Sequence, residues 1–175
     1  MIGPLPSFDA ALVLRVGGDV VYSHGDVDRV FPLASVTKPI VAWSVLVAVE
    51  RGLISLDDPA GPEGATVRHL LAHASGLPFE GRRPVAAPGK RRIYSNEGFD
   101  ILGEVVAEAS GMGVAQWVRQ TVFDPLGMGS ADILGSPAHA GVASAADVSL
   151  FGAELARPTL VSAPMAALAG LSQFP

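Results

Sequence analysis

The stretch FPLASVTKPI, residues 31–40, places a serine and a lysine three positions apart among apolar residues and follows the lysine with a proline. The next twelve residues, VAWSVLVAVERG, are nearly all apolar and end in an arginine and a glycine. This pattern predicts a helix buried on most sides, with a basic last turn and a glycine stop. Proline fits near a helix start, where its missing N–H would find no partner anyway. We therefore expect Ser35 to Lys38 in the first turn.

The pairing of Ser35 with Lys38 suggests chemistry, because residues three apart on a helix share a face and the hydroxyl can meet the amine. A serine hydroxyl is a weak nucleophile unless a base removes its proton. Lysine becomes such a base where burial and the positive end of a helix disfavour its charged form. The alternative is a capping serine followed by a surface lysine, and the common four-letter pattern alone favours that alternative.

The composition indicates one globular domain. Of 175 residues, 49% are apolar and only 17% are charged, which suffices for a substantial core. The net charge of −5 and the lack of a long Lys/Arg run argue against nucleic-acid binding. Without cysteine there are no disulfides or thiolate metal sites, and the pair His69 and His73 is a weak metal signal. We expect no metal and no cofactor.

No membrane or export signal is recognised. The N-terminal residues contain two prolines and an aspartate and lack a positive start followed by an unbroken apolar run, which argues against a secretory signal. The apolar run after Lys38 is about a dozen residues, whereas a bilayer span needs about twenty. We expect no membrane contact and, by default, a cytoplasmic location.

Along the chain, one hairpin precedes a series of helices. AALVLRV (10–16) and DVVYSHG (19–25) flank two glycines and predict an antiparallel hairpin. Helical patterns follow over 66–73, 96–111, 113–128 and 144–158. Because a lone hairpin is marginally stable, something else is expected to complete its sheet.

A second motif lies in RRIYSNEGF (91–99), where Tyr94 and Asn96 are spaced Y-x-N just before a predicted helix. Together with LISLDDP (53–59), LLAHASGLP (70–78) and VFDPLGM (122–128), this order resembles the serine β-lactamase and penicillin-binding-protein superfamily. It is most similar to the class C-like branch of β-lactamases, esterases and D-stereospecific peptidases. The resemblance covers almost the whole chain.

The resemblance implies an α+β fold of the β-lactamase/transpeptidase type in a single domain, residues 1–175. A helical subdomain, about 34–175, would lie beside an antiparallel sheet of which only the N-terminal hairpin, about 8–25, is encoded. The superfamily normally has a third motif, K-T-G or H-x-G, on a late strand that supplies an oxyanion donor. HAG at 139–141 matches in letters but precedes a helical pattern, so we interpret it as accidental.

By position, the resemblance implies that Ser35 is the acylated nucleophile, Lys38 its proton acceptor and Tyr94 the proton relay. Asn96 would orient the lysine and bind the substrate carbonyl. Without the Ser35 pair, Tyr94 would be interpreted as a packed aromatic and Asn96 as a turn former. His73 is interpreted as part of a structural turn.

The sequence favours the first of three functions, and the other two are alternatives. The first is a serine hydrolase acting through an acyl-enzyme on a β-lactam, a short-chain ester or a D-amino-acid peptide. The second is a penicillin-recognising binding or sensor module, and the third a structural domain that self-associates or binds a complementing chain at the open hairpin edge. Because the third motif is missing, we expect a C-terminally truncated protein with weak or no activity, since losing one oxyanion donor costs about 100- to 1000-fold in rate.

Overall fold

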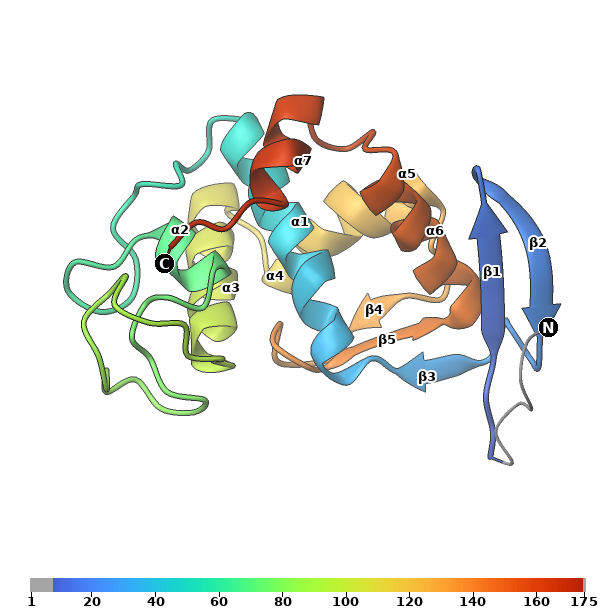
Figure 1. The fold of residues 1–175 in the computed structure, drawn as a ribbon, viewed down its shortest axis with the longest axis horizontal. Helices are drawn as coiled ribbons and strands as arrows, with labels where there is room; N and C mark the ends of the chain where they lie inside the picture. The colour runs from blue at the N-terminus through green and yellow to red at the C-terminus, as the bar shows by residue number, and fades with distance from the viewer. Residues whose placement is uncertain (1–7, 175) are drawn as a thin grey trace.

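The computed structural model describes residues 8–174 (Figure 1). The prediction that the N-terminus is not a secretory signal concerns residues 1–7 in part, and these lie outside the described range. The N-terminal hairpin consists of β1 (Leu12–Val16) and β2 (Asp19–His24), paired antiparallel as predicted. Gly17 and Gly18 form its turn with φ angles of +64° and +106°, values that side chains disfavour.

A second antiparallel sheet was not predicted. It contains β3 (Val30–Pro32), β4 (Asp132–Ile133) and β5 (Gly141–Ser144), in the order β3-β5-β4. These strands have two to four residues, too few for a visible alternation of apolar and polar side chains. The interpretation that HAG lies outside any strand was therefore wrong for Gly141, which opens β5. Two sheets beside a group of helices agree with the expected α+β class.

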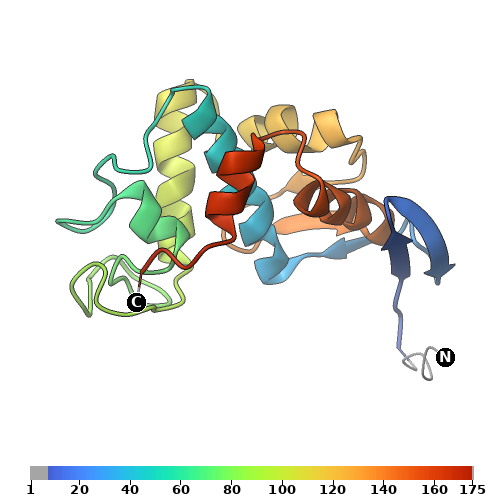
Figure 2. The ribbon, with the colours of Figure 1, turned by 45° about the horizontal axis from the view of Figure 1, so that its top comes forward.

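The helix α1 (Thr37–Glu50) occupies the centre of the molecule, and the short 3₁₀ turn η1 (Ala34–Val36) precedes it. Figures 1 and 2 show α1 between α3 on one side and α6 on the other. Its residues Ile40, Val41 and Val45 have no exposed surface. Arg51 and Gly52 end it, as the sequence predicted, with Gly52 at φ +70°.

The remaining helices surround α1. They are α2 (Val67–Leu71), α3 (Glu97–Ser110), α4 (Val114–Val118), α5 (Asp124–Leu126), α6 (Ala145–Ala156) and α7 (Ala163–Ala169). The predicted helix over 113–128 contains a π-helical turn, η2 (Arg119–Phe123), between α4 and α5. Ser144 caps α6 by accepting a hydrogen bond from the Asp147 N–H, at the start of the helix predicted over 144–158. None of the helices within residues 8–174 is long and apolar enough to cross a membrane.

The hairpin lies at one end of the molecule, beside α6 (Figure 1). Arg15 of β1 donates a hydrogen bond to Ser149 Oγ of α6 at 3.0 Å. On the same strand Leu14 and Val16 are 43% and 61% exposed. No third strand pairs with β1 or β2 in the part of the chain that the structure describes. The hairpin therefore presents apolar side chains and unpaired strand edges to solvent.

Glu154 of α6 fixes the helix against α1 and against the segment that follows it. Its buried carboxylate accepts hydrogen bonds from the indole N–H of Trp43, from the N–H and hydroxyl of Thr159, and from the Leu160 N–H. Burial acts to raise the pKa of Glu154, but these hydrogen bonds outweigh it, and the pKa lies below its ordinary value.

Replacing this carboxylate should destabilise the fold. Glu154→Gln replaces one acceptor oxygen with an NH₂ group, which would face the N–H and O–H donors that the carboxylate now accepts. The free energy of unfolding, measured in urea at neutral pH, should therefore fall by about 2 kcal/mol. The matched change Glu108→Gln, on the exposed face of α3, should alter it little. Because the folded-state pKa is lowered, the carboxylate stabilises the fold above the unfolded-state pKa of about 4.3, and this contribution disappears as pH falls through the folded value. Equal stability of Glu154→Gln and wild type at pH 7 would contradict this role.

Candidate active site

The four residues selected from the two motifs converge at the first turn of α1. Ser35 lies in η1 and is exposed, whereas Lys38, the second residue of α1, is 3% exposed. Tyr94 and Asn96 come from the loop that leads into α3. Two of the four belong to a segment more than fifty residues away in sequence, and the fold brings them to the same amine.

The Lys38 amine is held by three acceptors. Nζ donates to Ser35 Oγ at 3.2 Å, to Asn96 Oδ1 at 2.6 Å and to the Ala138 carbonyl at 2.9 Å. Asn96 occupies the N-cap position of α3 but makes no capping hydrogen bond with its side chain. Its amide oxygen accepts the hydrogen bond from Lys38 instead.

Tyr94 covers the same amine from the solvent side. Its ring centroid lies 4.6 Å from Lys38 Nζ, and the residue is 42% exposed. Burial acts to raise the pKa of Tyr94, but the Ser35 hydroxyl and the nearby Lys38 amine lower it, and the net shift is downward. The phenol is therefore biased toward giving up its proton next to Ser35.

The backbone that carries Ser35 is unusual and is tied down. Ala34 has φ +45°, a left-handed conformation that is uncommon for a residue other than glycine. Its carbonyl accepts the Thr37 hydroxyl at 2.7 Å, and the same hydroxyl accepts the Gly141 N–H at 2.9 Å. Thr37 thus links the turn before Ser35 to the start of β5.

Sequence reasoning missed Thr37, Ala138 and Gly141. Ala138 acts through its carbonyl and Gly141 through its N–H and its lack of a side chain, so neither leaves a chemical signature in the sequence. The HAG sequence lies in this segment, but His139 itself is exposed. The contacts with Lys38 and Thr37 come from the neighbouring Ala138 and Gly141. The signal that could have found the site was the small residues on both sides of His139.

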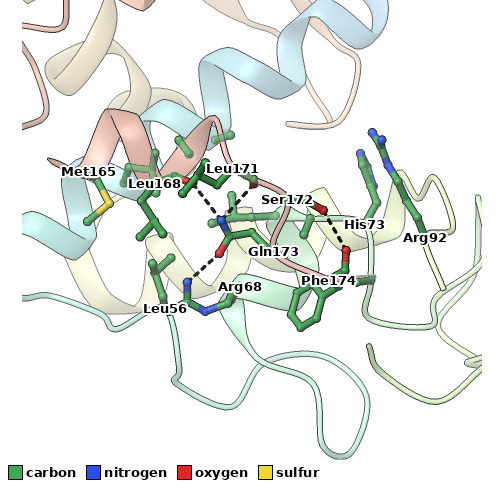
Figure 3. Close-up of a pocket in the computed structure, with 16 residues that line it drawn as sticks. Leu56, Arg68, His73, Arg92, Met165, Leu168, Leu171, Ser172, Gln173 and Phe174 are labelled. Atoms are coloured by element: carbon green, nitrogen blue, oxygen red, sulfur yellow. Dashed lines mark hydrogen bonds between the residues drawn. The ribbon is translucent and has the colours of Figure 1, made fainter. Parts of the chain in front are cut away.

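A separate cavity of about 530 Å³ lies between α1, α2, α7 and the segment after α7 (Figure 3). Its lining is mainly apolar, with Leu56, Met165 and Leu168 among the residues, and it includes Arg68, which donates a hydrogen bond to Gln173 at 2.9 Å. Ser35, Lys38 and Tyr94 do not line it. Within residues 8–174, no three His, Asp or Glu side chains are grouped so that they could hold a metal ion.

The fold and this serine–lysine–tyrosine site define a class of protein. The family model described as Beta-lactamase matches residues 8–172, and the chain belongs to that family. A β-lactamase of known structure from Mycobacterium bovis is 48% identical and superposes with a TM-score of 0.83, over 85% of this chain and 56% of that one. The expected β-lactamase-like fold is confirmed.

Two curated relatives carry different activities in their names. Esterase EstB of Burkholderia gladioli is 35% identical over 58% of this chain, and the D-alanyl-D-alanine-carboxypeptidase/endopeptidase AmpH of Escherichia coli is 30% identical over 63%. The aligned part spans 38% of the length of each of these relatives. Because these relatives are named for different activities, similarity to them does not identify the substrate of this chain.

Adding a side chain at Gly141 should disturb the turn before Ser35, because Gly141 packs against Thr37. A Cβ at this position would lie 2.6 Å from Thr37 Oγ1 and 3.1 Å from Thr37 Cγ2, so rotating the threonine does not relieve the contact. Gly141→Ala should therefore lower the free energy of unfolding by about 1–3 kcal/mol, measured by urea denaturation. Gly129→Ala, where a Cβ would meet nothing within 4 Å, is the matched control. Equal stabilities of the two variants would show that β5 does not press on the turn before Ser35.

Proposed function

We propose that this chain carries the nucleophilic centre of a serine hydrolase that acts on an ester or amide through an acyl-enzyme. The observation that carries the proposal is the arrangement of Lys38 Nζ, hydrogen-bonded to Ser35 Oγ and to two further acceptors. In the neutral amine, the two N–H groups would bond to Asn96 Oδ1 and the Ala138 carbonyl. The lone pair would then point at the Ser35 hydroxyl, which is the orientation a general base needs.

The acylation step follows from this arrangement. The Ser35 hydroxyl proton moves to Lys38 Nζ while Oγ forms a bond to the substrate carbonyl carbon. The bond to the leaving group then breaks, and the leaving group takes a proton. Tyr94 is suited to deliver that proton and to take up the proton held on Lys38 Nζ in its place, because its ring lies 4.6 Å from Nζ and the residue is 42% exposed. Water then attacks the ester on Ser35, releases the acid and restores the hydroxyl.

Three substrate classes fit this chemistry: a β-lactam, a short-chain ester and a D-amino-acid peptide. The names of the similar proteins, a β-lactamase, an esterase and a carboxypeptidase, support the same three classes. All three present a carbonyl to an activated serine and differ in the groups around it. No metal or cofactor takes part in the proposed reaction.

The second candidate is a penicillin-recognising module with little turnover. It differs from the first candidate in turnover, because both require acylation of Ser35. Such a module would be acylated once and would release product very slowly. Label that stays on Ser35 for hours, without hydrolysis of excess substrate, would favour this candidate.

Two earlier expectations stay predictions. The exposed hairpin agrees with self-association or a complementing chain, and the mass of the protein in solution as a function of concentration would test it. The cytoplasmic location is likewise a prediction.

Covalent labelling tests the proposed nucleophile. A fluorophosphonate or a fluorescent penicillin should label Ser35, and Ser35→Ala should abolish the label, read by intact-protein mass spectrometry and peptide mapping. Lys38→Arg should slow labelling by about 100-fold or more, because arginine keeps the charge but does not release a proton. Label that persists in folded Ser35→Ala protein would disprove the assignment.

The Tyr94 hydroxyl can be tested without disturbing its ring. Tyr94→Phe retains the contact of the ring with Lys38 but removes the proton donor, so hydrolysis of an ester with a poor leaving group should slow by about 10²-fold. An activated ester, whose leaving group needs no proton, should be affected less. Tyr22→Phe, on the hairpin, is the matched control. If both esters react with Tyr94→Phe at the wild-type rate, Tyr94 serves only in packing.

A further inference from the structure

His73 lies in the loop after α2 and takes no part in the chemistry proposed above. It is 7% exposed, and its backbone has φ +57°, in the left-handed region that residues other than glycine seldom adopt. A histidine held in this conformation and buried requires a reason, because the strain must be offset by its contacts.

The contacts of His73 bracket Tyr94. The His73 carbonyl accepts the Ile93 N–H at 2.8 Å, and His73 Nδ1 accepts the Ser95 N–H at 3.2 Å. The imidazole ring also packs on the Tyr94 ring, with centroids 4.6 Å apart. The N–H groups of Ile93 and Ser95, the residues on either side of Tyr94, are therefore both held by His73.

The same loop also holds the next residue of the motif. The Asn96 N–H donates to the Phe79 carbonyl at 2.9 Å, and the Asn96 side chain then reaches Lys38. Between these anchors, Gly76 packs so tightly that a Cβ would lie 2.0 Å from the Ala86 carbonyl oxygen. The loop over 73–79 is thus a rigid support against which residues 93–96 are hydrogen-bonded.

We propose that His73 is a positioning residue, which accepts the Ser95 N–H and so fixes the Tyr94 ring and the Asn96 amide against the Lys38 amine. This rests on the proposed function, since it assumes that Tyr94 and Asn96 serve the Ser35–Lys38 pair. It assigns a role to the one histidine that sequence analysis interpreted as part of a structural turn.

The role requires one tautomer. Nδ1 accepts a hydrogen bond, so the neutral ring must carry its proton on Nε2, and the imidazolium form would turn a donor toward the Ser95 N–H. The charged or titratable groups that face His73 are Lys38, Arg92 and Tyr94. His73 and Arg92 both line the cavity shown in Figure 3.

The environment keeps His73 neutral. Burial, and then the charges of Arg92 and Lys38, lower the pKa of His73 to about 4. The acceptor is therefore present at neutral pH and is lost only as pH falls through about 4. In the unfolded chain the ring takes up its proton near pH 6.5, so this histidine reduces the stability of the fold as pH falls from about 6.5 toward 4.

Three substitutions separate the acceptor from the strained backbone. His73→Asn places Oδ1 close to the position of Nδ1 and tolerates a left-handed φ. His73→Leu has the size of asparagine but no acceptor, and His73→Gly relieves the backbone strain and also has no acceptor. All three lack the aromatic ring, so the loss of stacking is common to them.

The experiment measures covalent labelling of Ser35 in each folded variant, resolved into reagent affinity and maximal rate. The maximal rate should fall by about 10- to 100-fold in His73→Leu and His73→Gly, with affinity nearly unchanged, and recover to within about threefold of wild type in His73→Asn. Equal rates in the asparagine and glycine variants would overturn the proposal, because backbone strain alone would then explain the effect.

A second measurement does not depend on activity. Nitrogen chemical shifts of the His73 ring should report the Nε2–H tautomer at pH 7 and protonation near pH 4. The Asn96 side-chain amide signals should shift in His73→Leu and not in His73→Asn. Absence of Ser35 labelling in wild type would refute the proposed function, whereas an Nδ1–H tautomer or unmoved Asn96 signals in His73→Leu would refute the role of His73.

Discussion

A lysine amine with almost no access to water must find its hydrogen-bond acceptors inside the protein, because an unsatisfied buried amine is very costly. Lys38 finds them on Ser35, Asn96 and Ala138, which lie far apart along the chain. The first comes from the 3₁₀ turn before α1, the second from the start of α3 and the third from the turn before β5. Much of the fold can be understood as the support that keeps these three oxygens in place around one nitrogen.

The sequence predicted the parts of this arrangement that local geometry determines. The contact of Ser35 with Lys38 follows from helical spacing, and the stop of α1 at Gly52 from the preference of glycine for positive φ. That Tyr94 and Asn96 meet the same amine was inferred from family resemblance, since nothing in residues 91–99 alone indicates where that loop packs. Their catalytic and binding roles stay predictions.

The parts that sequence reasoning missed act through the backbone or through conformation. Ala138 contributes a carbonyl, Gly141 an N–H, and the three-stranded sheet consists of strands too short to show a period. The contacts of His73 could not be predicted from the sequence either. Its left-handed backbone and its hydrogen bond with Ser95 depend on how two loops pack together. Side-chain chemistry could be predicted, whereas main-chain contacts between distant segments could not.

The Ala138 carbonyl has a consequence for how such a site responds to genetic change. Every codon change at residue 138 leaves a carbonyl oxygen in the chain, so a saturation scan would score this position by side-chain fit alone and would overlook its contact with the amine. Exchanging the amide between residues 138 and 139 for an ester weakens the acceptor without altering any side chain. One of the three acceptors of Lys38 is therefore shielded from direct removal by point mutation, and evolution can tune it only by moving the turn between β4 and β5 that carries it.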